Sequence, residues 1–324
     1  MQEYDNARKP TPVLYFIKSR KIKFVKTILT LRTFGIFLSL LLFCSHSPAD
    51  SIVPQLPADS TMNKNAGRGN FLFVMLRLEN GGELPFMVDT GSPITVFDES
   101  LEPKLGKCLK RGTVTMGGVK QKSGRYAAPK LYLGSAPLMT GSNIYTYDIR
   151  QKERHSTYMG ILGMDCLEHY CIQLNFEAEK IHFLDSDHLN TAELGKAFPL
   201  TFKGGHIYIH HAGLLGGTNT DSLVDTGWNI DAQVEKGALK GHDSGWVRLP
   251  KCVWDNETYT NLNVEVSQNA NMLGLKFLAR HLVTFDFPKR TMYLKKGIDP
   301  LVNENTKAVV DGSNGHIIKE CPGR

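Results

Sequence analysis

Short apolar runs, separated by glycines and polar residues, dominate the chain after about residue 70. Residues 71–78 read as a strand, 80–82 (Asn-Gly-Gly) as a hairpin turn, and 83–88 as the returning strand. Short helices are expected around 165–170 and 276–281, and no long amphipathic pattern occurs. The sequence predicts an all-β protein of many short strands, with further strands at 172–176, 180–184, 206–210, 222–224, 283–287 and 291–294.

The tripeptide Asp-Thr-Gly occurs twice, at 89–91 and 225–227, each time at the end of an apolar run. The paired aspartates are 136 positions apart (225 − 89). Each copy is followed by an apolar block that contains Leu-Gly, at 160–167 and 272–278, and then by a hairpin-like pair of runs. The two sets align as one internal repeat, which predicts a pair of similar lobes and not a solenoid.

With these motifs the chain resembles the retropepsin-like and pepsin-like aspartic proteases, whose sequences share an apolar strand, Asp-Thr/Ser-Gly and a later apolar-apolar-Gly turn. The resemblance covers about residues 68–297. It implies a bilobal, pseudo-twofold acid-protease fold with two retropepsin-like β-barrel lobes, 68–190 and 191–297. It also implies a monomer, an internal pseudo-dimer, with Asp89 and Asp225 as the catalytic residues.

Two carboxyl groups held close together cannot both ionise cheaply, so they share a proton. The ionised carboxylate takes a proton from water, while the protonated one donates to the carbonyl of the scissile amide. The sequence does not decide whether Asp89 or Asp225 carries the proton. We therefore expect an aspartic endopeptidase that acts on a peptide or protein substrate without a cofactor or a metal.

The residues beside each aspartate have expected roles. Gly91 and Gly227 let the backbone turn tightly and approach the carboxylates. The resemblance implies that the hydroxyls of Thr90 and Thr226 bond across to the opposite loop. It also implies that two Leu-Gly pairs pack beside these loops: Leu162-Gly163 and Leu273-Gly274.

The residue after each glycine differs between the two copies. Ser92 follows the usual pattern, and we expect its hydroxyl to bond the outer oxygen of Asp89. Trp228 stands in the equivalent place and offers only an indole N–H. This asymmetry keeps a second hypothesis open, a non-catalytic peptide-binding module on the same fold.

A protease of this kind needs a segment that covers its substrate. In the first lobe, 113–118 reads as a glycine-tipped hairpin, with Met116, Gly117 and Gly118 as the candidate flap. In the second lobe, 243–246 is the corresponding candidate. An ordinary surface turn is the alternative for both segments.

The first 49 residues differ from the rest in charge. They hold eight Lys and Arg against two acidic residues, a net of +6, so the remaining 275 residues carry 30 basic (38 − 8) and 30 acidic (32 − 2) side chains. The basic excess therefore does not indicate nucleic-acid binding. The uncharged run 33–44 suits a secretory signal and is short for a membrane span.

We expect 1–49 to be a cleaved signal peptide or a retained signal anchor, with a lipoprotein at Cys44 as a weaker alternative. The protein is then exported to a periplasmic or extracellular location, and contacts the membrane only through this segment. Residues 50–67 read as a linker and 298–324 as a flexible tail.

Cysteine and histidine residues do not form a metal motif. No Cys-x-x-Cys pair occurs, and Cys166 and Cys171 fall in an apolar block where buried thiols are expected. On a strand, His206 and His210 share a face, but no carboxylate lies at ligand spacing in the sequence. We expect solvated strand histidines there.

Overall fold

The computed structural model describes residues 56–79, 81–116, 118–152, 157–210, 221–268 and 271–297. The chain divides into one unit at 1–51 and a second at 52–324, and all the described residues belong to the second. The predicted leader, residues 50–55 of the predicted linker, Gly117 and the predicted tail lie outside the described residues.

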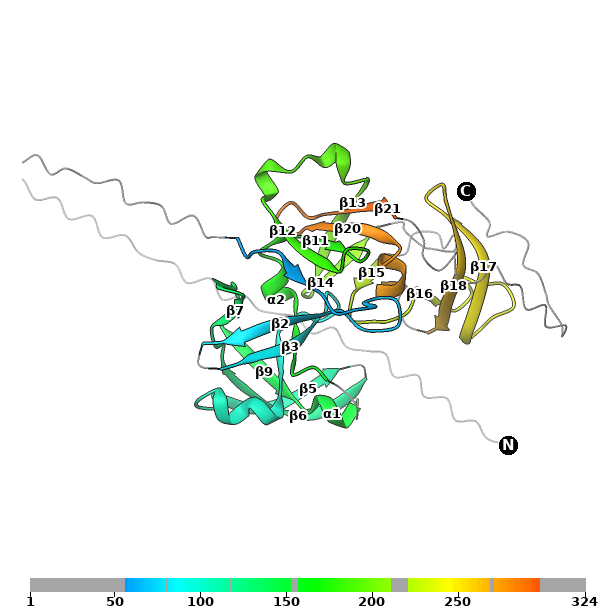
Figure 1. Ribbon diagram of the computed structural model, residues 1–324. Coiled ribbons are helices and arrows are strands. Elements are labelled where there is room, and N and C mark those ends of the chain that lie inside the picture. The colour runs from blue at the N-terminus through cyan, green and yellow to red at the C-terminus, as the bar shows by residue number, and fades with distance from the viewer. Residues whose placement is uncertain are drawn as a thin grey trace, which may run out of the picture. The chain divides into compact units, whose positions relative to one another are not determined.

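Strands dominate the described chain, so the prediction of an all-β protein is confirmed (Figure 1). One sheet has nine strands, in the spatial order β5 (Lys110–Met116), β6 (Val119–Ala127), β9 (Asn143–Tyr147), β4 (Val96–Asp98), β10 (Gly160–Leu162), β3 (Glu83–Val88), β2 (Phe73–Leu78), β7 (Leu131–Leu133) and β8 (Ala136–Pro137). The other sheet has twelve, in the order β1 (Ser60–Thr61), β12 (Lys180–Leu184), β11 (Cys171–Asn175), β20 (His281–Asp286), β21 (Thr291–Lys296), β13 (Lys196–Lys203), β14 (His206–Ile209), β15 (Ser222–Asp225), β19 (Asn271–Gly274), β16 (Ala232–Glu235), β18 (Glu257–Ser267) and β17 (Gly245–Trp254).

Helices are short throughout the described chain. The expected helices near 165–170 and 276–281 are present, one turn each and shifted towards the N-terminus. None of the helices in the described residues is long and apolar enough to cross a bilayer. The helical elements are α1 (Ile149–Lys152), α2 (Met164–Leu167), α3 (Leu275–Leu278), and the 3-10 turns η1 (Glu99–Lys104), η2 (Ser186–His188) and η3 (Thr191–Glu193).

The strand patterns follow from burial. In β2, Val74, Leu76 and Leu78 are buried and alternate with more exposed residues, because successive side chains point to opposite faces of a sheet. The second half of β3 is buried at every position, since β3 lies between β2 and β10 in the sheet interior. The predicted hairpin of 71–88 is confirmed by the antiparallel pairing of β2 with β3.

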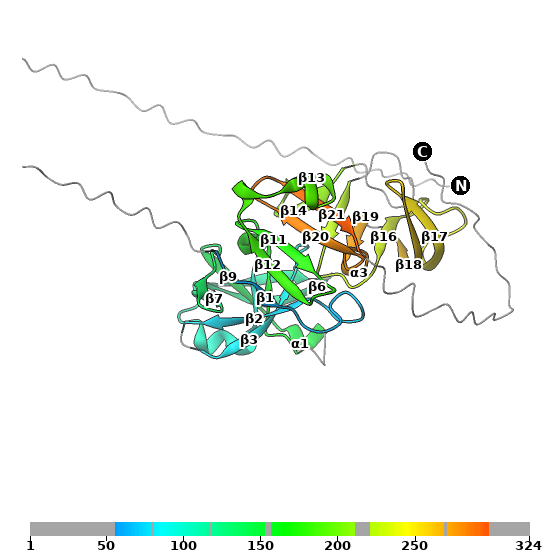
Figure 2. The same ribbon diagram turned by 45° about the horizontal axis from the view of Figure 1, so that its top comes forward.

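Strands from both predicted lobes, 68–190 and 191–297, pair in one sheet. Strand β11 pairs antiparallel with β20, so that Ile172 lies opposite Phe285 and Leu174 opposite Val283. Strands β11 and β12, which the prediction assigned to the first lobe, therefore belong to the twelve-stranded sheet, as Figures 1 and 2 both show. The cause is that the two sequence-related runs satisfy each other's backbone hydrogen bonds.

The prediction of a linker at 50–67 is wrong for its described part. Residues Ser60–Thr61 form β1 on the edge of the twelve-stranded sheet. Met62 is 3% exposed, and Gly67 is so close to Ala279 that a Cβ atom would lie 2.4 Å from the methyl carbon of that alanine. The described part of this segment therefore packs against the rest of the protein, which a linker does not do.

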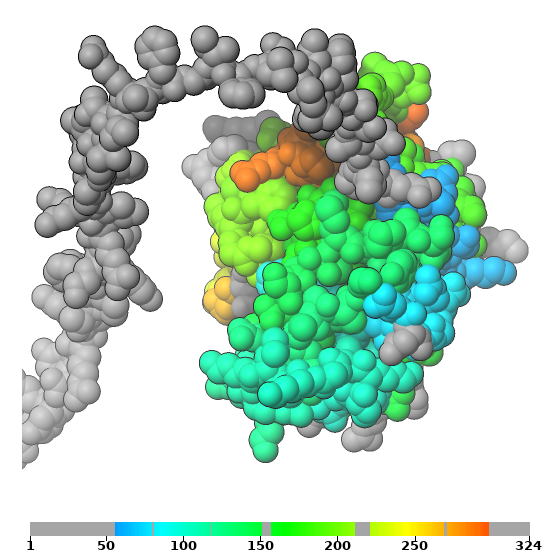
Figure 3. All heavy atoms as spheres, turned by 90° about the vertical axis from the view of Figure 1, so that its left-hand side faces the viewer, coloured from blue at the N-terminus to red at the C-terminus, as the bar shows by residue number. Residues whose placement is uncertain are grey.

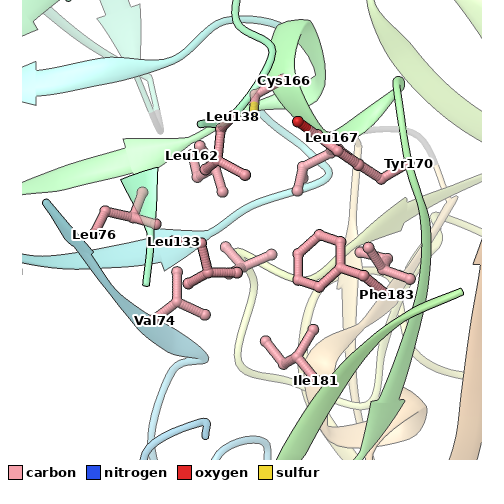
Figure 4. Close-up of a pocket in the computed structure, with 12 residues that line it drawn as sticks. Val74, Leu76, Leu133, Leu138, Leu162, Cys166, Leu167, Tyr170, Ile181 and Phe183 are labelled. Atoms are coloured by element: carbon pink, nitrogen blue, oxygen red, sulfur yellow. The ribbon is translucent and has the colours of Figure 1, made fainter. Parts of the chain in front are cut away.

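A small cavity in the core has a predominantly apolar lining. It occupies about 20 Å³ between β2, β7, α2 and β12, and Figure 4 shows Leu76, Leu162 and Phe183 among the side chains around it. A cavity of this size has room for one water molecule, but a predominantly apolar lining does not favour hydration.

In the space-filling view of Figure 3, cyan to green segments of the nine-stranded sheet occupy the lower part of the coloured surface.

Histidine 281 is buried in the core at 4% exposure. Its Nδ1 lies 3.0 Å from the Phe277 carbonyl oxygen and its Nε2 lies 2.9 Å from the Tyr259 hydroxyl. The neutral ring satisfies both contacts, donating through Nδ1 and accepting at Nε2. Burial lowers the pKa of His281 to about 4 from its ordinary value of 6.5.

We expect this histidine to make the fold acid-sensitive. Between pH 6.5 and about 4 the unfolded chain binds a proton at His281 that the folded chain does not, so stability is retained above pH 6.5 and falls as the pH drops toward 4. The difference in pKa corresponds to about 3 kcal/mol. Urea unfolding at pH 7, 5.5 and 4 measures it, and His281→Gln should flatten the decline. His169→Gln, at an exposed histidine, is the control, and equal slopes for all three proteins would contradict the assignment.

Candidate active site

Each Asp-Thr-Gly loop follows a strand that has a parallel neighbour. Strand β3 pairs with β10, so that Val88 lies opposite Leu162, and β15 pairs with β19, so that Asp225 lies opposite Gly274. The later strands β10 and β19 also pair antiparallel with β4 and β16. The strand before each loop is therefore held by a parallel neighbour, which is itself held by a further strand.

Two threonines lock these loops to each other, as the resemblance implied. The backbone N–H of Thr90 donates to Thr226 Oγ1, and the N–H of Thr226 donates to Thr90 Oγ1, both at 3.0 Å. The hydroxyl of Thr90 donates to the carbonyl of Val224 at 2.8 Å, and that of Thr226 to the carbonyl of Val88 at 2.7 Å. Both threonines are fully buried, so no solvent competes for these four bonds.

Gly91 and Gly227 allow the carboxyl groups of Asp89 and Asp225 each to lie close to the opposite loop. The N–H of Gly91 donates to Asp89 Oδ1, and that of Gly227 to Asp225 Oδ1, both at 2.8 Å. A Cβ atom on Gly91 would lie 2.3 Å from the carboxyl carbon of Asp225, and one on Gly227 would lie 2.3 Å from that of Asp89. Each carboxyl group therefore lies against the opposite loop, where only glycine fits.

The Leu-Gly segments close the site from behind, as expected. A Cβ atom on Gly163 would lie 2.4 Å from the carbonyl oxygen of Ile94, and one on Gly274 2.4 Å from that of Ile230. Directly after each glycine, a backbone N–H donates to the loop at 2.8 Å, from Met164 to Ser92 and from Leu275 to Trp228. These contacts hold the residues that follow each Asp-Thr-Gly.

The expected role of Ser92 is wrong. Its hydroxyl donates to the carbonyl of Ile94 at 2.8 Å. A hydroxyl has one hydrogen, so Ser92 does not also donate to Asp89. The Ile94 carbonyl is two residues from Ser92 along the chain. Serine hydroxyls often donate to such nearby backbone groups.

Trp228 occupies the same loop position beside Asp225 and lines the cleft described below. Its backbone N–H donates to the carbonyl of Asp225 at 3.4 Å. Its indole Nε1 is buried and has no hydrogen-bond partner among the described residues. The two loops therefore differ in side chain while they agree in backbone contacts.

A cleft of about 480 Å³ opens over the two aspartates. Asp225 is 9% exposed and Asp89 is half-buried. Beside Asp225 and Gly227, the twelve-stranded side contributes His206, Trp228 and Met272 to the lining of the cleft. The wall on the other side is apolar and comes from the nine-stranded part: Met87, Val96, Val114, Met116, Tyr158 and Ile161.

The described residues of the candidate flap, 113–116 and 118, belong to a hairpin beside this cleft. Strands β5 and β6 pair up to Met116 and Val119, and Gly118 has a φ of +79°, which glycine adopts easily. Val114, Thr115 and Met116 line the cleft. The described part of the predicted flap therefore lies where it can contact a bound molecule.

The second flap candidate, 243–246, does not form a hairpin tip. Gly245 begins β17, and the β17–β18 hairpin turns at Asp255 and Asn256 instead. That turn is held by an ion pair between Asp255 and Lys196 on β13. Residues 243–246 are not part of the cleft lining, so this prediction is wrong: the long strands β17 and β18 carry the turn elsewhere.

Behind each loop lies an acidic residue that the sequence did not reveal as important, the half-buried Asp165 behind one and the buried Asp231 behind the other. Thr95 accepts from the Gly163 N–H at 3.2 Å and donates to Asp165 Oδ1 at 2.6 Å. Burial raises the pKa of Asp165, and the bond from Thr95 opposes that shift. No motif marks either residue, because their contact joins positions 70 residues apart.

On the other side, Asp231 forms a buried ion pair with Arg280, at 3.1 Å between Asp231 Oδ1 and the guanidinium Nε. Both side chains are 2% exposed. Burial raises the pKa of Asp231, while the charge of Arg280 opposes the shift. The backbone of Asp231 accepts from the Gly274 N–H at 3.0 Å, so this pair supports the Leu-Gly segment.

The expectation for the histidines needs one correction. His210 Nδ1 is hydrogen-bonded to Asp221 Oδ1, so the fold supplies the carboxylate that sequence spacing did not. His206 lines the cleft, which the sequence did not suggest. The described residues contain no group of three or more His, Cys, Asp or Glu side chains that could hold a metal ion.

The prediction of buried thiols is confirmed for Cys166 and Cys171, which are free and buried. Burial raises the pKa of the Cys171 thiol to about 12, and raises that of Cys166 as well. Thiols of this kind are inert at neutral pH.

Two carboxyl groups in one cleft can supply a proton acceptor and a proton donor to the same bound molecule. The apolar wall of this cleft and the β5–β6 hairpin beside it suit an extended, partly apolar ligand. No protein-family model matches the chain, and a comparison with curated proteins finds none that is significantly similar to it.

Proposed function

We propose that this protein is an aspartic endopeptidase, in which Asp89 and Asp225 activate a water molecule for hydrolysis of a peptide bond. The single observation that carries the proposal is the reciprocal contact of the two loops. Each threonine bonds to the opposite loop, and each glycine touches the opposite carboxyl group. A pair of ordinary turns has no need of such contacts.

The corresponding contacts support a bilobal, pseudo-twofold acid-protease arrangement. The bonds around Gly163 and Met164 have counterparts around Gly274 and Leu275 with closely similar distances. In this proposal the lobes are built on the nine-stranded sheet and on strands β13–β19 of the twelve-stranded sheet. Strand β11 pairs antiparallel with β20, which connects the two lobes within one chain. In this proposal the active protein is therefore a monomer.

The proposed reaction begins with the two carboxyl groups sharing one proton. The ionised aspartate accepts a proton from water as the water oxygen attacks the scissile carbonyl carbon. The protonated aspartate donates its proton to the carbonyl oxygen, which gives a neutral tetrahedral intermediate. When the C–N bond breaks, the aspartate that took the proton from water gives it to the leaving nitrogen, and the other aspartate takes a proton from a hydroxyl of the intermediate, which restores the shared proton.

The cleft supports a peptide as substrate. Its apolar wall can bury an apolar side chain, at roughly 25 cal/mol for each Å² removed from water. The β5–β6 hairpin can exclude water above the scissile bond. We also propose that the protein is exported, because basic residues precede the uncharged run 33–44, as in a secretory signal.

The test is cleavage of a peptide library by the full chain from acid to neutral pH, with and without a statine-type transition-state inhibitor. We expect cleavage that the inhibitor suppresses and that chelators do not affect. Absence of cleavage at every pH would contradict the proposal.

A peptide-binding module without catalysis is the second candidate. Trp228 favours it, because a bulky side chain without an acceptor stands beside Asp225. Peptide binding without turnover, unchanged by the statine-type inhibitor, would support this candidate instead.

A further inference from the structure

One residue from each of six neighbouring strands forms a row across the twelve-stranded sheet. Backbone pairing aligns these residues in the order Tyr208, Leu223, Met272, Gln233, Glu265 and Trp246, from β14 to β17. Residues directly opposite each other in a sheet share a face. We call this set the outer row, because the residues flanking it in these strands, such as Val224, Leu273 and Val264, are buried in the core.

The outer row begins at the cleft and ends on the surface. Met272 lines the cleft, and Leu223 stands two residues before Asp225. At the other end, Trp246 is 63% exposed on β17, the edge strand of the sheet. Figures 1 and 2 show β17 and β18 as a hairpin at one side of the described chain, well away from β2 and β3.

Glu265 is the one acidic residue of the outer row, and it lacks a partner. Its Oε2 is buried and has no hydrogen bond, and no ion pair to it is found among the described residues. The nearest cation by register is Arg248, which lies opposite Asn263 on the same face. Its guanidinium donates instead to Asn261 Oδ1 at 3.2 Å. A half-buried carboxylate without a partner is costly, and a cation from another molecule removes that cost.

We propose that the outer row extends the substrate cleft, and that Glu265 and Trp246 together bind a lysine or arginine side chain of the substrate. This inference rests on the proposed function, since it takes the cleft as the place of cleavage. The carboxylate supplies a charge-assisted hydrogen bond, and the indole face of Trp246 attracts the same cation. Between Asp225 and Glu265 the outer row contains no other charged side chain: Leu223 and Met272 are half-buried and Gln233 is buried.

The strand spacing gives the position of this basic residue in the substrate. Neighbouring strands lie about 4.8 Å apart, so three spacings from β15 to β18 cover roughly 14 Å. An extended peptide advances about 3.4 Å per residue, so the basic side chain stands about four residues from the scissile bond. The substrate is therefore an extended segment with a cationic residue near its fourth position on one side.

The experiment compares two pairs of peptides with the full chain. The two peptides of a pair differ only at about the fourth residue from the scissile bond, where one has Lys and the other has Gln. In the first pair this residue lies on the N-terminal side of the scissile bond, and in the second pair on the C-terminal side. We expect one pair to show a preference for Lys of about three- to tenfold in kcat/KM, mainly through KM. High salt should reduce this preference. Glu265→Gln should bring the ratio to about one, and Trp246→Ala should lower it.

Glu257→Gln is the matched control. It removes the same charge from the same strand, β18, at a residue that pairs with Lys296, so the preference should stay as in the wild type. The inference is overturned if neither pair shows a Lys preference, or if Glu265→Gln keeps it.

If no peptide is cleaved, the proposed function fails and the inference is judged by binding alone. Fluorescence anisotropy of labelled Lys and Gln peptides then measures the same ratio for the wild type and Glu265→Gln. A ratio that this substitution leaves unchanged overturns the inference.

Discussion

Replacing Asp89 or Asp225 with asparagine should lower the rate of peptide cleavage by at least about 10³-fold. An amide of the same shape cannot take a proton from water or share one with the other carboxyl group. The loops should stay intact, because an asparagine oxygen can still accept from the Gly91 or Gly227 N–H, as Oδ1 of each aspartate does now at 2.8 Å. Single-turnover cleavage assays and circular dichroism on the same preparations measure both parts.

Asp243→Asn is the control for this prediction, at a surface aspartate whose side chain is 78% exposed and pairs only loosely with Lys236. It should cleave at the wild-type rate. Cleavage that persists in either Asp89→Asn or Asp225→Asn would exclude a dyad mechanism, whatever the fold of the protein.

The second large effect concerns stability. Thr90→Val should lower the free energy of unfolding by about 2–6 kcal/mol, and so should Thr226→Val. Valine has the shape of threonine, but Thr90→Val leaves the Val224 carbonyl and the Thr226 N–H buried without their partner. Each buried group left unpaired costs about 1–3 kcal/mol. Denaturant unfolding measures the loss, and activity should fall with it, since the loops would no longer be held together.

The double variant tests whether the two threonines act as one unit. Because each hydroxyl bonds to the other residue's N–H, the two losses should not add fully. Thr113→Val, an exposed threonine on β5, is the control and should change stability by less than about 0.5 kcal/mol. Unfolding curves of the single variants that coincide with the wild type would show that the four bonds contribute nothing.

Local features of the sequence were enough to place most strands. The alternation in β2, the hairpin to β3 and the paired runs of β11 and β12 were all predicted within about two residues. The pairing of β11 with β20 was not, because backbone hydrogen bonds carry no record of which strand will satisfy them. For the same reason the run at 60–61 read as part of a linker, although it is a strand.

The site shows the same division. Asp89, Thr90 and Gly91 were found because a short motif recurs, and repetition is visible without a structure. For Ser92 the expected acceptor was wrong, since the conformation of the folded loop decides that its hydroxyl donates to the Ile94 carbonyl. The supporting pairs Thr95–Asp165 and Asp231–Arg280 join residues 70 and 49 positions apart and carry no pattern.

By itself, the amino-acid sequence determined the class of fold, the two acidic loops and the glycines beside them, because these depend on the periodicity of a strand and on the shape of a tight turn. Only the tertiary structure decided what those loops touch. It set the carboxyl groups against each other's loops, left Glu265 Oε2 without a hydrogen-bond partner among the described residues and brought Met272 of the outer row to the cleft. Such relations arise when distant segments pack, and their free energy belongs to contacts that the linear order of residues does not contain.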